Sequence, residues 1–204
     1  MNILDDLSDK VEGIKKEDIE KILNFHGCLS PGALIGIQMF NLANKILKIK
    51  DGERIYAICE TYNCLPDAFQ ILGGCTIGNK RLKVIDTGKM AVTVNKWGRE
   101  GETVRGVRII LDPKKTIKYP KLHAWYLNIE KVPHDEVILD ILNAGEDAYS
   151  YEFVDILVPS KSKKHVKICE ICNEPFIQKE NEDICPSCLH KTNINSKDYL
   201  LCHW

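Results

Sequence analysis

The sequence of 204 residues contains no apolar run approaching the roughly 20 residues that a membrane-spanning helix needs. It also has almost no net charge, −1, and therefore no general attraction to nucleic acid or to an anionic membrane. The first residues, Met1 to Asp6, are acidic and lack the basic segment that opens a secretory signal. From these absences we expect a cytoplasmic protein that does not associate with membranes.

The nine cysteines of the chain indicate metal binding or chemistry more readily than disulfides, because the cytoplasm is reducing. Four of them are spaced as Cys169-x2-Cys172-x12-Cys185-x2-Cys188. Two such CxxC turns supply the four soft, tetrahedral ligands that Zn²⁺ prefers. An iron–sulfur cluster is the alternative, but the tighter C-x2-C-x2-C run of a ferredoxin is missing. The spacing predicts one structural zinc per chain.

A change of composition near Pro159 predicts the domain boundary. We expect a core domain over residues 1–160, then a basic linker and a small, treble-clef-like zinc-finger domain with four cysteine ligands over residues 161–204. Lysine and acidic residues are nearly balanced in this second part, which disfavours a nucleic-acid surface. We expect the terminal Trp204 to dock on this chain or on a partner.

Hydrophobic periodicity and turn residues predict an α+β core, with N-terminal helices packed on a mostly antiparallel sheet. No repeated βαβ unit is present. The segments that read as strands are rich in Ile, Val and Tyr, and turn signals such as Asp51-Gly52 and Gly73-Gly74 lie between them and the helical segments. Expected helices span residues 8–24, 31–48, 66–72 and 134–143, and expected strands span residues 54–59, 82–85, 90–95, 102–111 and 152–158, the second and third of these strands flanking the turn 86–88.

A second group of possible ligands lies near the N-terminus. His26 and Cys28 stand two residues apart in a turn before a helix, and Cys64 follows a strand and precedes another helix. One imidazole and two thiolates would hold a metal, most simply Zn²⁺, and leave a fourth coordination position open. The alternative is that these cysteines simply pack in the core, as cysteine often does.

Three ordered blocks resemble the E subunit of formylmethanofuran dehydrogenase and its homologues, over about residues 20–160. The first is Phe25-His26-Gly27-Cys28-Leu29-Ser30-Pro31-Gly32, similar to the family's F-H-G-H-x-C-P-G. The second runs from Cys64 to Gly78 and contains Cys-x-x-Asp-Ala-x-Gln and Gly-Cys-Thr-x-Gly. The third begins Asp86-Thr87-Gly88-Lys89. Some members of this family carry a zinc module like the one above.

The resemblance raises the expectation of a core metal site, but one block departs from the family pattern. The family's second histidine is Cys28 here, and its cysteine is Ser30. The resemblance therefore implies a site of His26, Cys28 and Cys64, in which imidazole and thiolate have exchanged places. Cys75 and Asp67 are further candidates, although Asp67 could equally be a helix cap. Lys89 and Thr76 could face an anionic ligand.

The family name implies a complex that reversibly reduces CO₂ onto methanofuran at a tungsten or molybdenum pterin centre. This chain has neither tandem ferredoxin-type cysteines nor a molybdopterin motif, so the resemblance implies an accessory or related role in methanogenesis. Whether the chain is itself an enzyme stays open.

A second interpretation is a zinc-finger binding module for nucleic acid or a protein partner, without catalysis. A third is a finger that clamps a homodimer, the commonest symmetric oligomer.

Overall fold

The computed structural model describes residues 14–160, 163–179 and 181–191. The chain divides into two compact units, Met1–Pro159 and Ser160–Trp204. The start of the expected helix at 8–24 and the terminal Trp204 lie outside the described residues. Within the described part, no helix is long and apolar enough to cross a membrane.

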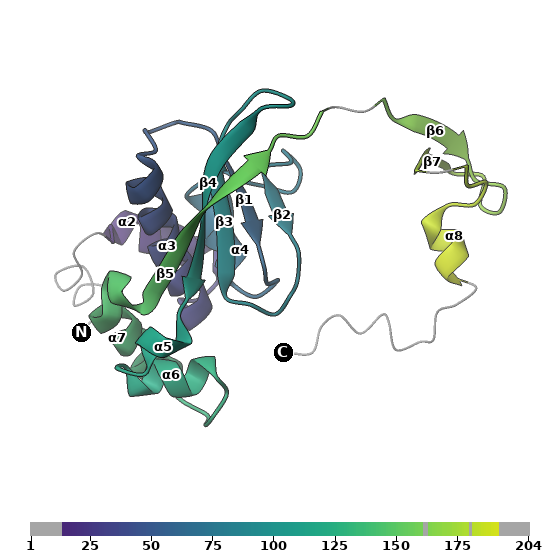
Figure 1. The fold of residues 1–204 in the computed structure, drawn as a ribbon. Helices are drawn as coiled ribbons and strands as arrows, with labels where there is room; N and C mark the ends of the chain where they lie inside the picture. The colour runs from purple at the N-terminus through teal and green to yellow at the C-terminus, as the bar shows by residue number, and fades with distance from the viewer. Residues whose placement is uncertain (1–13, 161–162, 180, 192–204) are drawn as a thin grey trace. The chain divides into compact units, whose positions relative to one another are not determined.

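The first unit contains one five-stranded sheet with helices on one of its faces (Figure 1). The strand order is β2-β1-β3-β4-β5, and every neighbouring pair is antiparallel except β1 and β2. The α+β class and the mostly antiparallel sheet are as predicted. The elements are α2 (Lys16–His26), α3 (Pro31–Leu47), β1 (Ile55–Cys59), α4 (Leu65–Ile71), β2 (Leu82–Val84), β3 (Ala91–Lys96), β4 (Thr103–Leu111), α5 (Pro113–Thr116), α6 (Pro120–Tyr126), α7 (His134–Ala144), the 3₁₀ turn η1 (Gly145–Ala148) and β5 (Tyr149–Leu157).

Two features of the first unit differ from the elements that the sequence predicts. The strands on either side of the turn 86–88 are not neighbours, because β1 lies between them and pairs with both. The short helices α5 and α6 are not among the predicted elements. Each begins at a proline and has seven residues or fewer, which is too short for a periodic hydrophobic pattern.

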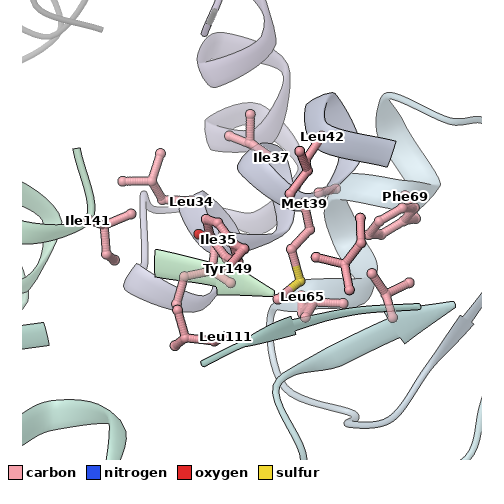
Figure 2. Close-up of a cluster of buried hydrophobic side chains, with 14 of the residues drawn as sticks. Leu34, Ile35, Ile37, Met39, Leu42, Leu65, Phe69, Leu111, Ile141 and Tyr149 are labelled. Carbon is pink, nitrogen blue, oxygen red and sulfur yellow. The ribbon is translucent and has the colours of Figure 1, made fainter. Parts of the chain in front are cut away.

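Helix α3 is the centre of the hydrophobic core (Figure 2). It begins at Pro31, after Ser30, whose hydroxyl accepts a hydrogen bond from the amide of Ala33 at 3.2 Å. Its residues 31–39 are all buried, so the first half of the helix is covered on all sides, and α3 packs against β3 and β4 of the sheet, against α2 and α4, and against α7. Residues 31–37 are all apolar, and a helical segment that is apolar all round is typical of a buried position.

The crossing of α3 and α4 is very close. A Cβ atom placed on Gly36 of α3 would lie 2.8 Å from the carbonyl oxygen of Leu65 and 2.9 Å from the Cβ of Ala68. Only glycine fits at this position without moving α4. The two helices therefore touch at their backbones, and a side chain at position 36 would push them apart.

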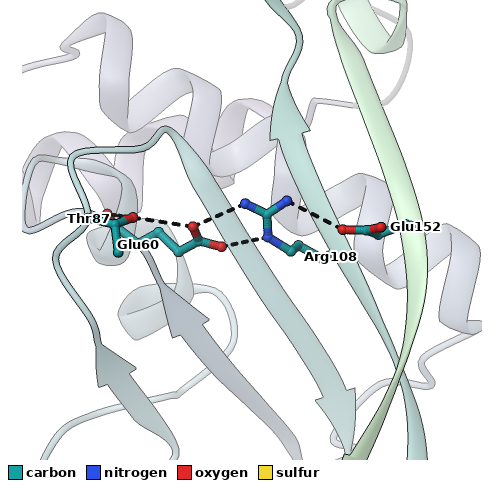
Figure 3. A network of polar contacts seen from close by, with 4 residues as sticks. All are labelled: Glu60, Thr87, Arg108 and Glu152. Carbon is teal, nitrogen blue, oxygen red and sulfur yellow. Dashed lines mark hydrogen bonds and ion pairs between the residues drawn. The ribbon is translucent and has the colours of Figure 1, made fainter.

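The face of the sheet opposite α3 and α4 carries a polar network (Figure 3). The guanidinium of Arg108 in β4 donates two hydrogen bonds to Glu60, at 2.6 and 3.0 Å. A third nitrogen lies 3.4 Å from Glu152 in β5, and Thr87 donates to Glu60 at 3.3 Å. Glu60 and Arg108 are partly buried, so the network joins the end of β1 to β4 and β5 through a pair that is partly shielded from solvent.

The network predicts a pH-dependent contribution to stability. The hydrogen bonds from Arg108 hold the pKa of Glu60 below its ordinary value, so its contribution is complete above the unfolded pKa of about 4.3 and is lost as the pH falls through the folded pKa. We expect Glu60→Gln to lower the free energy of unfolding at pH 7 by about 1 to 2 kcal/mol. The difference from wild type should shrink in acid, as measured by denaturant unfolding.

Glu146→Gln is the matched control, because Glu146 forms an exposed ion pair with Lys45. Exposed pairs contribute little, so this variant should unfold almost as the wild type does. A deficit for Glu60→Gln that is the same at pH 7 and pH 3 would contradict the charge-based explanation.

Candidate metal sites

The second unit is built from a hairpin and a short helix. Strands β6 (His165–Ile168) and β7 (Pro175–Gln178) are antiparallel, and α8 spans Pro186–Lys191. The first cysteine pair lies in the turn of the hairpin, and the second lies at the start of α8. This hairpin-and-helix arrangement fits the small zinc-finger-like module that the spacing predicts.

The four cysteines of this unit bring their sulfur atoms together. The Sγ atoms of Cys169, Cys172, Cys185 and Cys188 all lie within 4.8 Å of one another, and those of Cys172 and Cys185 are 3.8 Å apart. A tetrahedral Zn²⁺ with Zn–S bonds of about 2.3 Å has S···S edges of about 3.8 Å. Three of the four side chains are buried. The cluster therefore has the size and chemistry of a metal site with four thiolate ligands.

Backbone amides prepare one of these sulfurs for a cation. The Sγ of Cys169 accepts a hydrogen bond from the amide of Cys185 at 3.3 Å. Hydrogen bonds from the backbone of Cys172 and Cys185 lower the pKa of the Cys169 thiol to about 6. A thiolate is the form that ligates a metal, so these donors favour the ligating state.

In the first unit, His26 is the last residue of α2 and faces α4. Its Nδ1 lies 2.7 Å from Oδ2 of Asp67, and its Nε2 lies 3.3 Å from the hydroxyl of Ser30. The other oxygen of Asp67 accepts a hydrogen bond from Gln70 at 3.1 Å. The carboxylate is thus fixed on one side by an amide and fixes the imidazole on the other. With the proton on Nδ1 facing the carboxylate, Nε2 is the nitrogen left for a metal.

Cys64 lies close to the start of α3. It immediately precedes α4, and its carbonyl accepts a hydrogen bond from the amide of Asp67 at 3.2 Å. A Cβ placed on Gly32, in the first turn of α3, would lie 3.2 Å from the Cβ and 3.7 Å from the Sγ of Cys64. The absence of a side chain at Gly32 therefore lets the thiol approach the start of α3, which follows the turn that contains Cys28.

The predicted core ligands are less closely gathered than those of the finger. Cys28 is exposed, whereas Cys64 is half-buried. Among the described residues, the four-cysteine cluster is the one group of three or more possible ligands whose atoms lie within 4.8 Å of one another. A core site of His26, Cys28 and Cys64 stays a prediction.

Two other cysteines belong to the hydrophobic core. Burial raises the pKa of the Cys59 thiol to about 12 and that of Cys75 to about 11. The Cys75 thiol lies 3.4 Å from the carbonyl oxygen of Ile55, to which it donates. Both groups are held as neutral thiols, so Cys75, a further candidate ligand on sequence grounds, has the surroundings of a packing residue.

The sequence does not assign the partner of His26. It indicates Asp67 as a ligand or a helix cap, and it gives Gln70 no role. The spacing Cys64-x-x-Asp67-x-x-Gln70 is the available signal, since residues three apart share a helix face. Nothing in the spacing shows that this face meets His26, which lies 41 positions earlier in the chain than Asp67.

Comparisons with known proteins agree with this architecture. Residues 25–158 match the sequence model of the family described as "FmdE, Molybdenum formylmethanofuran dehydrogenase operon". A crystal structure from Syntrophus aciditrophicus, of a protein like the FmdE subunit of tungsten formylmethanofuran dehydrogenase, has a TM-score of 0.74 and 33% sequence identity. The match covers 88% of this chain and 94% of that one.

A longer relative comes from Archaeoglobus fulgidus. It is described as "Probable S-adenosyl-L-methionine-binding protein" and is 28% identical over 175 residues. The match covers 74% of this chain but 46% of the relative, so the chain spans less than half of that protein's length.

The finger unit should depend on its metal for structure. Its buried core consists of Cys169, Cys185 and Cys188, with Cys172, Phe176 and Ile184 packed against them, and domains below about 70 to 80 residues usually need a staple such as a structural metal. We expect a strong chelator to abolish hydrogen-exchange protection in β6 and β7 while β3 and β4 stay protected. Unchanged protection of β6 and β7 in metal-free protein would contradict a structural metal.

Proposed function

This chain belongs to the FmdE family, and on that basis we propose that it is a cytoplasmic, metal-binding accessory protein related to formylmethanofuran dehydrogenase. In this proposal, Cys169, Cys172, Cys185 and Cys188 hold a structural zinc. His26, Cys28 and Cys64 hold a second metal, also zinc, in the core unit. The chain does not carry the tungsten or molybdenum centre, and it acts as a homodimer.

The observation that carries the second site is the hydrogen bond between Asp67 and His26. A carboxylate on one ring nitrogen is the usual outer partner of a histidine that ligates zinc through the other. It fixes the tautomer and the ring orientation before the metal arrives. The hydrogen bond from Gln70 in turn fixes Asp67. This arrangement supports His26 as the anchoring ligand, with the thiols of Cys28 and Cys64 completing the set.

Three protein ligands would leave one position of a tetrahedral zinc for a small ligand. A zinc of this kind supplies Lewis-acid chemistry or lowers the pKa of a bound water. The residues of this chain would orient and retain it: Asp67 keeps the proton on Nδ1 of His26, and Ser30 presents a hydroxyl 3.3 Å from Nε2. The description of the Archaeoglobus relative makes S-adenosylmethionine the first small ligand to test.

The metal content of the full chain tests the proposal. We expect about two zinc ions per chain in the wild type and about one in Cys64→Ser, because Ser is a poor ligand for zinc in a thiolate site. Cys75→Ser is the matched control, since this thiol is also in the core unit but packs as a neutral group; it should keep both ions. The measurement is elemental analysis of purified protein, with circular dichroism to verify folding.

The two possible failures of this test have different meanings. One zinc in both the wild type and Cys64→Ser would contradict the core site and leave the finger site standing. Two zinc ions in Cys64→Ser would show that Cys64 is not a ligand.

A second candidate function is a module that binds another protein through the finger. Cross-strand partners Val166 and Ile177 and the neighbouring Ile168 are 67%, 49% and 63% exposed. They share one face of the β6–β7 hairpin, while Phe176 on the other face packs on the cysteine cluster. An exposed apolar face favours a protein partner over nucleic acid. Steeply salt-dependent binding to a random DNA or RNA oligonucleotide would reverse that preference.

A further inference from the structure

Strand β5 is an edge of the five-stranded sheet. It pairs with β4 along its whole length of nine residues, and the described part of the first unit places no strand on its other side. An edge of this length presents a row of unpaired backbone donors and acceptors, which is a template for another strand.

The pairing with β4 shows which backbone groups face outward. The amide of Val158 donates to Glu102 and the carbonyl of Ala148 accepts from Asp112, so even-numbered residues of this segment face β4. Since the direction alternates along a strand, the odd-numbered residues direct their N–H and C=O groups away from the sheet. The carbonyl of Tyr149 accepts a hydrogen bond from the ammonium group of Lys115. The open segment is therefore 151–157.

Three side chains of this open segment are both apolar and exposed. Tyr151, Phe153 and Leu157 lie on one face of β5 and are 52%, 47% and 66% exposed. The rings of Tyr151 and Phe153 meet edge to face with centroids 6.0 Å apart. Three exposed apolar residues on one face of an open edge strand are unusual in a monomer, because the edge strands of natural proteins are normally protected from pairing with other chains.

The acidic residues of β5 do not protect the edge, because β4 supplies an arginine for each. Glu152 pairs with Arg108 at 3.4 Å. Asp155 stands opposite Arg105 in the β4–β5 register, and the Arg105 guanidinium also covers the Phe153 ring at 4.1 Å from its centroid. Charged side chains usually block edge pairing by repulsion, and here that repulsion is reduced within each copy.

We propose that a second copy of this chain pairs with β5 in antiparallel fashion about a two-fold axis at Phe153, forming one continuous sheet across the two copies. Phe153 is the midpoint of the strand, and its outward N–H and C=O bond to the same residue of the partner. This register sets Tyr151 opposite Asp155 of the other copy and Glu152 opposite Val154. No like charges meet directly across the axis, so the strand is complementary to itself in charge as well as in backbone geometry.

The proposal names the surface of the homodimer proposed above, and it rests on neither metal site. Its test is therefore separate from metal content. The mass of the zinc-loaded full chain, measured under reducing conditions by light scattering and sedimentation, should be that of a dimer.

The first test removes one backbone donor. Phe153→Pro deletes an N–H that faces away from β4, where proline is tolerated, and Phe153→Ala removes the same ring but keeps the N–H. We expect Phe153→Pro to weaken dimerisation by more than about tenfold relative to Phe153→Ala, since the symmetry removes two hydrogen bonds. Equal dimer dissociation constants for the two variants would overturn β5 pairing, as would a monomeric wild type.

The second test addresses the register and avoids proline. Tyr151→Lys and Tyr151→Asp both remove the ring, but only the first places an opposite charge against Asp155 of the partner. We expect the Asp variant to dissociate about tenfold more readily than the Lys variant at low salt, and this gap to narrow at high salt. Equal dissociation constants would overturn this register. A dimer that survives all four substitutions would place the interface elsewhere on the chain.

Discussion

The close crossing of α3 and α4 is the constraint on which the core unit depends. Gly36 lets the two helices touch at their backbones, and Gly32, one turn earlier, faces Cys64. Because a short turn joins His26, the last residue of α2, to the start of α3, this contact holds His26 against the start of α4. Asp67 then lies within 2.7 Å of His26. A larger residue at Gly36 would separate the helices and, with them, the imidazole from its carboxylate.

The same sheet serves three purposes through its two faces and one edge. One face receives α3 and α4 and forms the core. The opposite face carries Arg108, whose partners Glu60 and Glu152 join strands that are far apart in sequence. The edge at β5 has its acidic side chains matched by arginines of β4 and its odd-numbered backbone groups open. Core packing, charge pairing and the proposed self-association therefore use different surfaces of one element.

The sequence is informative where function depends on local spacing. The cysteine pairs of the finger lie within two short turns, so their spacing alone predicts the cluster that the structure shows. The α+β class and most elements follow from periodicity in the same way. The place of β1 between β2 and β3 does not, because hydrophobic patterns do not specify the order of strands. The bond between His26 and Asp67 also depends on tertiary packing, which no short-range pattern reports.

X-ray absorption at the zinc edge tests the central claim of a second, mixed-ligand site most directly. A finger site alone would give a pure sulfur shell at about 2.3 Å. Two occupied sites, the second with His26, Cys28 and Cys64, would add nitrogen or oxygen at about 2.0 to 2.1 Å together with imidazole scattering. The account predicts this mixed shell in the wild type. A shell of sulfur alone would contradict it.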